Sequence, residues 1–179
     1  MTDSSTTTST QSNATVRSVD ALDLNRYVGT WYEIARLPLK WEDATATNIT
    51  ATYSLQDNGK IRVDNRSFDH EGNPDQAIAE ATPVEGEPGQ LTVDFLPKFI
   101  RWIPLTSGDY WVLKIDADYQ VALVGTPDHI NLWVLAREPH IEDAVLQKYL
   151  AEARDQGFDL TSLIRPSHDG RTVTDEMVA

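Results

Sequence analysis

The sequence predicts an all-β fold, an eight-stranded antiparallel up-and-down β-barrel with one C-terminal α-helix packed outside it. Two observations predict this fold. About eight strand-like segments follow one another between residues 30 and 137, with turn signals between them. A single amphipathic segment of helical period comes only after the last of them. Eight strands that close on themselves leave room for one small ligand, and a two-sheet sandwich is the alternative.

Length and charge narrow the class further. The 179 residues suit one domain with tails. We expect a polar, disordered tail over residues 1–18, a barrel domain over 19–165 and a C-terminal tail over 166–179. The formal net charge of −13 argues against nucleic acid as a partner, because phosphate binding needs a concentrated basic surface.

The chain contains no cysteine. Disulfides, cysteine-ligated metals, thiol catalysis and a lipidated cysteine are therefore excluded. No apolar run reaches the roughly 18 residues of a membrane span, and the Ser/Thr-rich N-terminus lacks the core of a signal peptide. As written, the sequence indicates a soluble, cytoplasmic protein.

Each strand is predicted from alternation and from the turns that bound it. A short helical turn over residues 22–27 leads to Gly29, and the first strand covers 30–37. Asn58-Gly59 predicts a hairpin, because these residues readily adopt positive φ. The remaining strands are predicted over residues 48–55, 60–68, 76–82, 91–95, 110–116, 120–126 and 131–137.

The predicted helix spans about residues 141–156. Glu142 and Asp143 stand in its first turn, where acidic side chains favour the helix dipole, and Gly157 ends it. Its apolar residues form one stripe, so we expect that face to cover the outside of the barrel. Residues 158–164 follow as a possible short strand.

Three motifs resemble those of the lipocalin family. The segment 29–36, GTWYEIAR, resembles the Gly-x-Trp signature of that family. Asp118-Tyr119 followed by residues 122–124 is similar to the second motif, and 132–137, LWVLAR, to the third. The resemblance covers residues 22–164 and is strongest to the branch of bacterial lipocalins, apolipoprotein D and plant temperature-induced lipocalins.

The resemblance implies a fold and a function. Gly29, Trp31 and Arg137 would form the structural motif at the closed end, with the Arg137 guanidinium across the Trp31 ring. The interior would carry a hydrophobic or amphipathic molecule, of the fatty acid or lysophospholipid class, for membrane lipid maintenance or stress response. The prostaglandin-synthesising lipocalins use a cysteine nucleophile, so that activity is not carried over to this chain. No catalytic residue, cofactor or metal is predicted, because the common catalytic and nucleotide-binding motifs are absent and all four histidines stand in polar turns or the tail. The lipid-anchored cysteine of bacterial relatives is absent too.

Two other functions stay open. One is a lipocalin-fold enzyme acting on a lipid or isoprenoid, with Glu33 or Tyr110 as acid or base. The other is an interaction module whose loops bind a protein partner or form a homodimer.

Alternation from Trp31 and Arg137 predicts which side chains face the interior. Glu33 and Lys114 are the charged ones, and we expect them to pair with each other or to address a ligand headgroup. A register error of one residue would turn all the predicted interior side chains of the affected strand outward. The predicted ligand-binding residues are Glu33, Ala35, Leu37, Tyr53, Val63, Asn65, Phe95, Tyr110, Val112, Lys114 and Trp133.

Aromatic and apolar residues also stand in two segments expected at the open mouth. They are Trp41 in the first loop and Phe99, Ile100 and Trp102 in the long loop after the fifth strand. Apolar side chains between cations in an acidic protein favour peripheral contact with a membrane, or control of ligand entry. The alternative is a loop that plugs the mouth or packs in a dimer contact.

Overall fold

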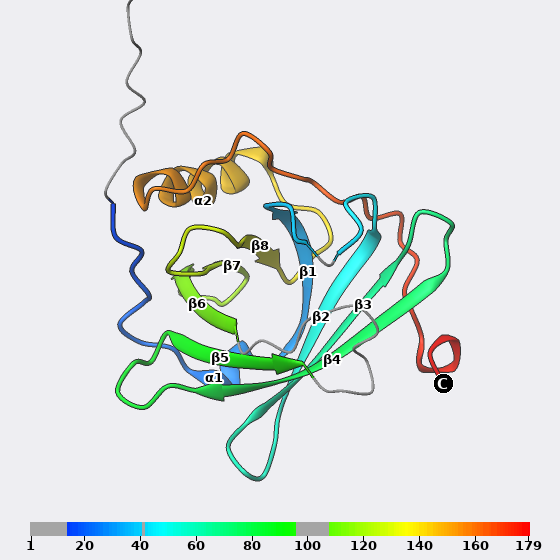
Figure 1. The fold of residues 1–179 in the computed structure, drawn as a ribbon, viewed down its shortest axis with the longest axis horizontal. Helices are drawn as coiled ribbons and strands as arrows, with labels where there is room; N and C mark the ends of the chain where they lie inside the picture. The colour runs from blue at the N-terminus through cyan, green and yellow to red at the C-terminus, as the bar shows by residue number, and fades with distance from the viewer. Residues whose placement is uncertain (1–13, 41, 96–107) are drawn as a thin grey trace, which may run out of the picture.

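The computed structural model describes residues 14–40, 42–95 and 108–179, which form a closed antiparallel barrel with the strands in sequence order (Figure 1). This confirms the predicted fold class, and each strand overlaps the segment that the sequence predicts for it. The strands are β1 (Gly29–Arg36), β2 (Thr47–Leu55), β3 (Ile61–Phe68), β4 (Pro74–Pro83), β5 (Gln90–Phe95), β6 (Gly108–Ile115), β7 (Val121–Gly125) and β8 (Leu132–Ala136).

A short helix, α1 (Leu24–Tyr27), closes one end of the barrel. Asp23 is its N-cap, and its carboxylate accepts a hydrogen bond from the backbone N–H of Asn25 at 3.0 Å. The chain then enters β1 through Gly29, whose φ is +104°. A Cβ at this position would lie 3.1 Å from a guanidinium nitrogen of Arg137. Glycine is therefore required both by the backbone angle and by the arginine packed beside it.

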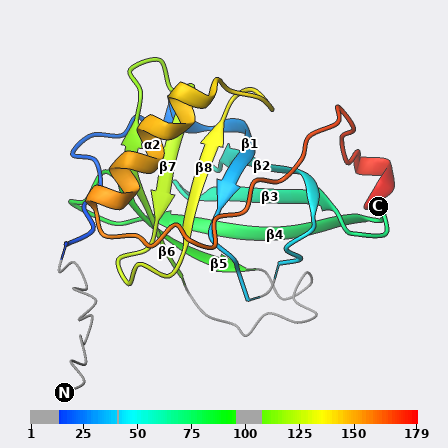
Figure 2. The ribbon, with the colours of Figure 1, turned by 90° about the horizontal axis from the view of Figure 1, so that it is seen from above.

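The helix α2 (Asp143–Asp155) lies outside the barrel along β7 and β8, as Figure 2 shows. Its buried residues are Leu146, Tyr149, Leu150 and Ala153. The Tyr149 hydroxyl donates to the backbone oxygen of Val121 on β7 at 3.1 Å. The predicted outer helix is thus confirmed, and its apolar stripe forms a second core between helix and barrel, separate from the core inside the barrel.

The ladder of β1 contains a bulge between Glu33 and Ala35. An extra residue in one strand reverses the facing of every side chain beyond it. Arg36 therefore lies on the same side as Glu33, while Ala35 and Leu37 pack in the outer core. The predicted interior positions of Ala35 and Leu37 are wrong for this reason.

A second irregularity lies between Val112 and Lys114 on β6. Val112 remains inside the barrel, but Lys114 points outward. Its Nζ lies 3.6 Å from a carboxylate oxygen of Glu152 on α2 and 5.9 Å from the centroid of the Tyr149 ring. The predicted interior placement of Lys114, and its pairing with Glu33, are therefore wrong.

The residues expected to form a C-terminal tail pack along β1, β2 and β3. Ile164 pairs with Arg36 through two backbone hydrogen bonds, the only bridge that the predicted strand over 158–164 forms among the described residues. At the bulge, His168 Nε2–H donates to the backbone oxygen of Glu33 at 2.8 Å. Further along, Val173 is buried. Part of the expected N-terminal tail also packs, since Arg17 N–H donates to Gln156 Oε1 at 2.8 Å.

Asn48 joins this C-terminal segment to the barrel. Its φ is +51°, its backbone N–H donates to the oxygen of Ser167 at 2.9 Å, and its side-chain oxygen accepts from the N–H of Asp169 at 3.0 Å.

We expect Asn48→Ala to lower the free energy of unfolding by about 2 kcal/mol, because alanine loses the side-chain hydrogen bond and tolerates positive φ poorly. Asn48→Gly, which loses only the bond, should lower it by about 1 kcal/mol. Urea denaturation would measure both losses. Equal losses in the two variants would contradict the contribution assigned to the positive φ of Asn48.

Candidate functional site

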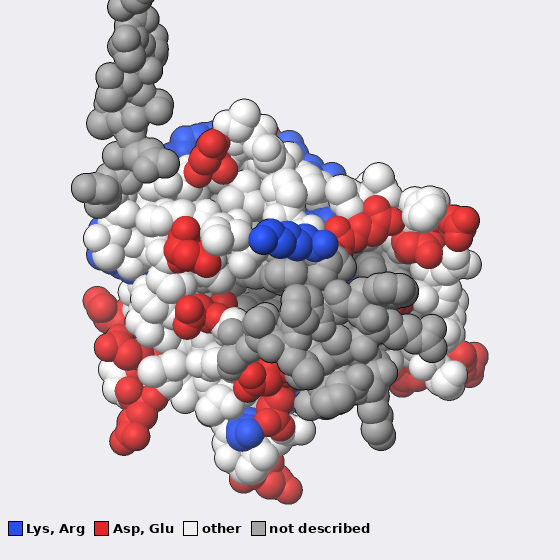
Figure 3. All heavy atoms as spheres, in the orientation of Figure 1, with Lys and Arg blue, Asp and Glu red and all other residues white. Residues whose placement is uncertain are grey.

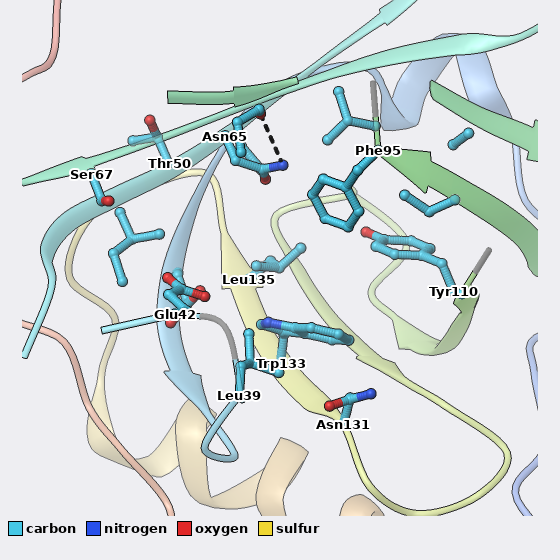
Figure 4. Close-up of a pocket in the computed structure, with 18 of the residues that line it drawn as sticks. Leu39, Glu42, Thr50, Asn65, Ser67, Phe95, Tyr110, Asn131, Trp133 and Leu135 are labelled. Atoms are coloured by element: carbon cyan, nitrogen blue, oxygen red, sulfur yellow. Dashed lines mark hydrogen bonds between the residues drawn. The ribbon is translucent and has the colours of Figure 1, made fainter. Parts of the chain in front are cut away.

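A cavity of about 970 Å³ occupies the barrel interior. It runs from Tyr27 on α1, at the closed end, to the opposite end of the barrel, where β1 ends and β2 begins. We call this opposite end the mouth. Its size lies in the range of small-molecule sites. Figure 4 shows Phe95, Tyr110, Trp133 and Leu135 converging on the same space from β5, β6 and β8.

Most of the predicted interior residues line this cavity. They are Glu33, Tyr53, Val63, Asn65, Phe95, Tyr110 and Trp133. Val112 lies inside the barrel but is fully buried in the core and does not line the cavity. Contact of these residues with a ligand stays a prediction. Ile49, Ala51, Asn131 and Leu135 line the wall as well.

The predicted mouth residues mostly fall outside the structure. Trp41, Phe99, Ile100 and Trp102 lie outside the described residues. Their neighbours Leu39 and Lys40 are described, and both line the cavity near the mouth.

Arg137 closes the floor beneath the cavity. Its guanidinium carbon lies 3.9 Å from the centroid of the Trp31 ring, which is fully buried. The same guanidinium donates to backbone oxygens of α1 and the segments beside it, at 2.8–3.2 Å; the acceptors are Arg26, Tyr27, Val28, Thr30 and Tyr119. The structure thus places Arg137 across Trp31, where the family resemblance expects it.

Three tyrosine hydroxyls meet on the cavity floor. The hydroxyl of Tyr110 lies 2.5 Å from that of Tyr27 and 2.9 Å from that of Tyr53. Burial raises the pKa of Tyr53 to about 12 and the pKa values of Tyr27 and Tyr110 well above the ordinary value. All three are therefore neutral hydrogen-bonding groups at physiological pH. The sequence gives no local signal for this cluster, because its members come from α1, β2 and β6.

One buried cation, Arg36, lies close to two carboxylates of the cavity lining. Arg36 is fully buried, and its Nη1 lies 2.8 Å from Glu33 Oε1 and 3.6 Å from Glu42 Oε1. Burial and the nearby Glu42 raise the pKa of Glu33 to about 8, against the opposing effect of Arg36. Burial also raises the pKa of Glu42. One guanidinium does not hold two buried carboxylates in the charged form, so this group retains a proton near neutral pH.

The mouth is acidic. Near it the cavity lining contains only two cations, Lys40 and Arg66, among the described residues. The lining carboxylates of this region are Glu42, Asp43, Asp69, Asp75, Asp109 and Asp128. Acidic side chains also outnumber basic ones on the face that Figure 3 shows. An anionic headgroup at the mouth would thus meet mostly like charges.

Residues 14–40, 42–95 and 108–179 show neither a metal-binding cluster nor a membrane-spanning helix. There, no group of three or more His, Cys, Asp or Glu side chains is arranged to hold a metal ion. No described helix is long and apolar enough to cross a membrane.

Comparison with known proteins decides the family. A family model described as a lipocalin-like domain matches residues 22–168. The chain belongs to the lipocalin family. Temperature-induced lipocalin-1 of Arabidopsis thaliana is 36% identical over 150 residues, which cover 81% of this chain and 78% of that protein. The outer membrane lipoprotein Blc of Citrobacter freundii is 39% identical over 155 residues, covering 83% and 81%.

A solved structure shares the fold at lower identity. Insecticyanin from Manduca sexta superposes with a TM-score of 0.68 at 21% identity, over 87% of this lipocalin and 85% of that chain. Membership in the family implies that the barrel binds a small hydrophobic molecule.

Proposed function

We propose that this lipocalin carries a fatty acid or lysophospholipid in its barrel and serves membrane lipid maintenance or a stress response. The observation that carries the proposal is the cavity of about 970 Å³, whose wall combines apolar side chains with a few polar ones. Such a wall buries an acyl chain favourably, at about 25 cal/mol per Å² of apolar surface. The names of the relatives, an outer membrane lipoprotein and a temperature-induced lipocalin, support the proposed context.

Within this ligand class, the charges favour a zwitterionic headgroup over a bare anion. The cationic end of a choline or ethanolamine group would lie near the carboxylates of the mouth, for example Asp75 and Asp109. Among the described residues, only Lys40 and Arg66 would offset those charges for a free carboxylate in the same place.

The contacts favour binding over turnover. Among the described residues, the Tyr110 hydroxyl bonds to two other tyrosine hydroxyls, and the Glu33 carboxylate bonds to Arg36. In this part of the chain neither group is hydrogen-bonded to a base that would activate it, whereas acid–base catalysis needs a proton acceptor within hydrogen-bond reach.

Extraction of the purified protein, followed by mass spectrometry, tests the proposal directly. We expect a co-purified lipid with a long acyl chain, and saturable uptake of a fluorescent lysophospholipid after its removal. Finding no lipid and no uptake would refute the carrier function.

A cavity-filling variant makes the test specific to the barrel. Asn65 lines the cavity on β3, and Arg62 on the same strand lies on the outer face with its side chain 42% exposed. We expect Asn65→Trp to weaken lysophospholipid binding at least about tenfold, because the indole occupies space that the acyl chain needs. Arg62→Trp adds the same ring outside and should leave the affinity unchanged. Equal affinities in the two variants would place the ligand elsewhere.

We also propose peripheral membrane contact through the mouth segments, on the sequence alone. Phe99 and Trp102 flank Arg101 in an otherwise acidic chain, a pattern that suits a lipid surface. We expect Phe99→Ser combined with Trp102→Ser to reduce binding to phospholipid vesicles in a sedimentation assay. Unchanged vesicle binding together with unchanged lipid uptake would exclude this contact, and light scattering would test the homodimer alternative.

A further inference from the structure

The tyrosine cluster on the cavity floor carries one hydrogen-bond donor more than its described partners accept. Three hydroxyls carry three hydrogens, and the two bonds that join Tyr27, Tyr110 and Tyr53 use two of them. Among the described residues these hydroxyls have no other hydrogen-bond partner. Whichever way the chain of bonds runs, one O–H remains to be satisfied.

That donor belongs to the cavity, because all three rings line it. Around it the floor is apolar, with Ile61, Ala81 and Leu91 in the same lining. A polar hydrogen left unpaired in such surroundings carries a cost, which an oxygen on the ligand would remove.

The floor suits an uncharged oxygen. Burial keeps the three phenols neutral, so they donate and accept without offering a charge. Arg137, the nearest cation below, is separated from the cavity by the Trp31 ring and its guanidinium is bonded to backbone oxygens. A carboxylate at this depth would thus find no counterion among the described lining residues, whereas a hydroxyl or carbonyl needs none.

Building on the carrier function proposed above, we infer that the cavity selects an amphiphile with oxygen at both ends. The headgroup stays at the acidic mouth, and a hydroxyl or carbonyl at the far end of the acyl chain bonds to the hydroxyls of Tyr27, Tyr53 and Tyr110. The ligand class is therefore a lysophospholipid-like molecule whose chain carries a terminal oxygen, as an ω-oxidised chain does. An unmodified chain would place a methyl group against the unpaired O–H.

Two lipids of equal headgroup isolate this contact. Palmitoyl lysophosphatidylcholine and its ω-hydroxypalmitoyl analogue differ by one oxygen at the chain end, and their shared bulky headgroup directs both to enter chain first. Binding to the delipidated protein is followed by tryptophan fluorescence, since Trp133 lines the cavity. We expect the wild type to bind the hydroxylated lipid about 3-fold to 10-fold more tightly, which is the worth of one net hydrogen bond.

The triple variant Tyr27→Phe, Tyr53→Phe, Tyr110→Phe should invert this preference. Replacing all partners of a hydrogen-bonded cluster by apolar groups of the same shape has little effect on folding, but it leaves the lipid hydroxyl buried without a partner. The hydroxylated lipid should then bind at least about 5-fold more weakly than the unmodified one. Tyr32→Phe is the matched control, because its ring packs on the outer face 5.7 Å from the His168 ring, and it should keep the wild-type preference.

Each result has one meaning. Equal binding of the two lipids by the wild type, or a preference that survives in the triple variant, overturns the floor subsite and leaves the carrier function standing. A wild type that binds neither lipid overturns the carrier function and the subsite together. If the triple variant does not fold, the ratio of the two affinities in the wild type decides.

Discussion

Replacing Trp31 by alanine is expected to lower the free energy of unfolding by about 3–5 kcal/mol. The indole is fully buried and forms the floor of the barrel, with the Tyr27 ring 5.1 Å from it on one side and the Arg137 guanidinium at 3.9 Å. Its Nε1–H also donates to the backbone oxygen of Tyr27 at 2.8 Å. Alanine removes the largest buried side chain of this end and leaves a cavity where α1 and β1 meet.

The substitution should also remove a stabilising contact of Arg137. Without the ring, its guanidinium keeps its backbone acceptors but loses the aromatic face that shields it from the cavity, and a partly buried cation without that face is less stable. Urea denaturation followed by circular dichroism measures the effect, with Trp31→Phe expected to recover part of it. Trp133→Ala is the matched control, since that ring is only half-buried and borders the open cavity. A Trp31→Ala loss no larger than that of Trp133→Ala would contradict the role of Trp31 as the floor.

The floor was predictable from sequence because its signals are local. Gly29 and Trp31 stand two residues apart, and Arg137 directly follows β8. The strands and α2 follow from the same kind of signal, since period, turn residues and charge in the first helical turn act within a few residues of one another.

The parts that failed depend on distant contacts. Strict alternation placed Ala35 and Leu37 inside because nothing in GTWYEIAR marks a bulge. The bulge turns Arg36 inward onto Glu33, while Ala35 packs under α2 and Ile164 pairs with the Arg36 backbone. Each partner comes from a different part of the chain, and tertiary packing therefore decides the facing of these residues.

The same distinction explains which cavity residues the sequence predicts. Residues on regular strands, such as Val63 and Trp133, lie where alternation puts them. The tyrosine cluster does not follow from any one segment, because Tyr27 comes from α1 and its partners from strands 26 and 83 residues further along the chain. Only the closed barrel brings these hydroxyls together.

Replacing Arg36 by methionine should lower the free energy of unfolding by about 3–5 kcal/mol near pH 9. Arg36 is the cation of the buried group, bonded to Glu33 at 2.8 Å and to the backbone oxygen of Asp43 at 2.8 Å, with Glu42 at 3.6 Å. Its removal leaves Glu33 buried without the one counterion that the described residues provide. The methionine fills most of the space, so the loss is mainly electrostatic.

The pH dependence separates that electrostatic loss from packing. In the wild type the folded-state pKa of Glu33 is raised to about 8, so the folded protein holds a proton that the unfolded chain releases at about pH 4.5. The contribution of Glu33 to the free energy of unfolding is therefore present at low pH, and it falls as the pH rises from 4.5 to about 8. Arg36 opposes the rise in pKa, so in Arg36→Met the folded-state pKa lies still higher and the fall continues beyond pH 8.

The variant should therefore lose less relative to the wild type near pH 6, where Glu33 is protonated in both proteins, than near pH 9. Urea denaturation at the two pH values measures the difference. The double variant Glu33→Gln, Arg36→Met has no carboxylate to titrate at this position, and it should recover the part of the loss that grows with pH while keeping the part due to packing. A loss equal at both pH values, or one that the double variant does not reduce, would show that Arg36 stabilises the barrel by packing alone.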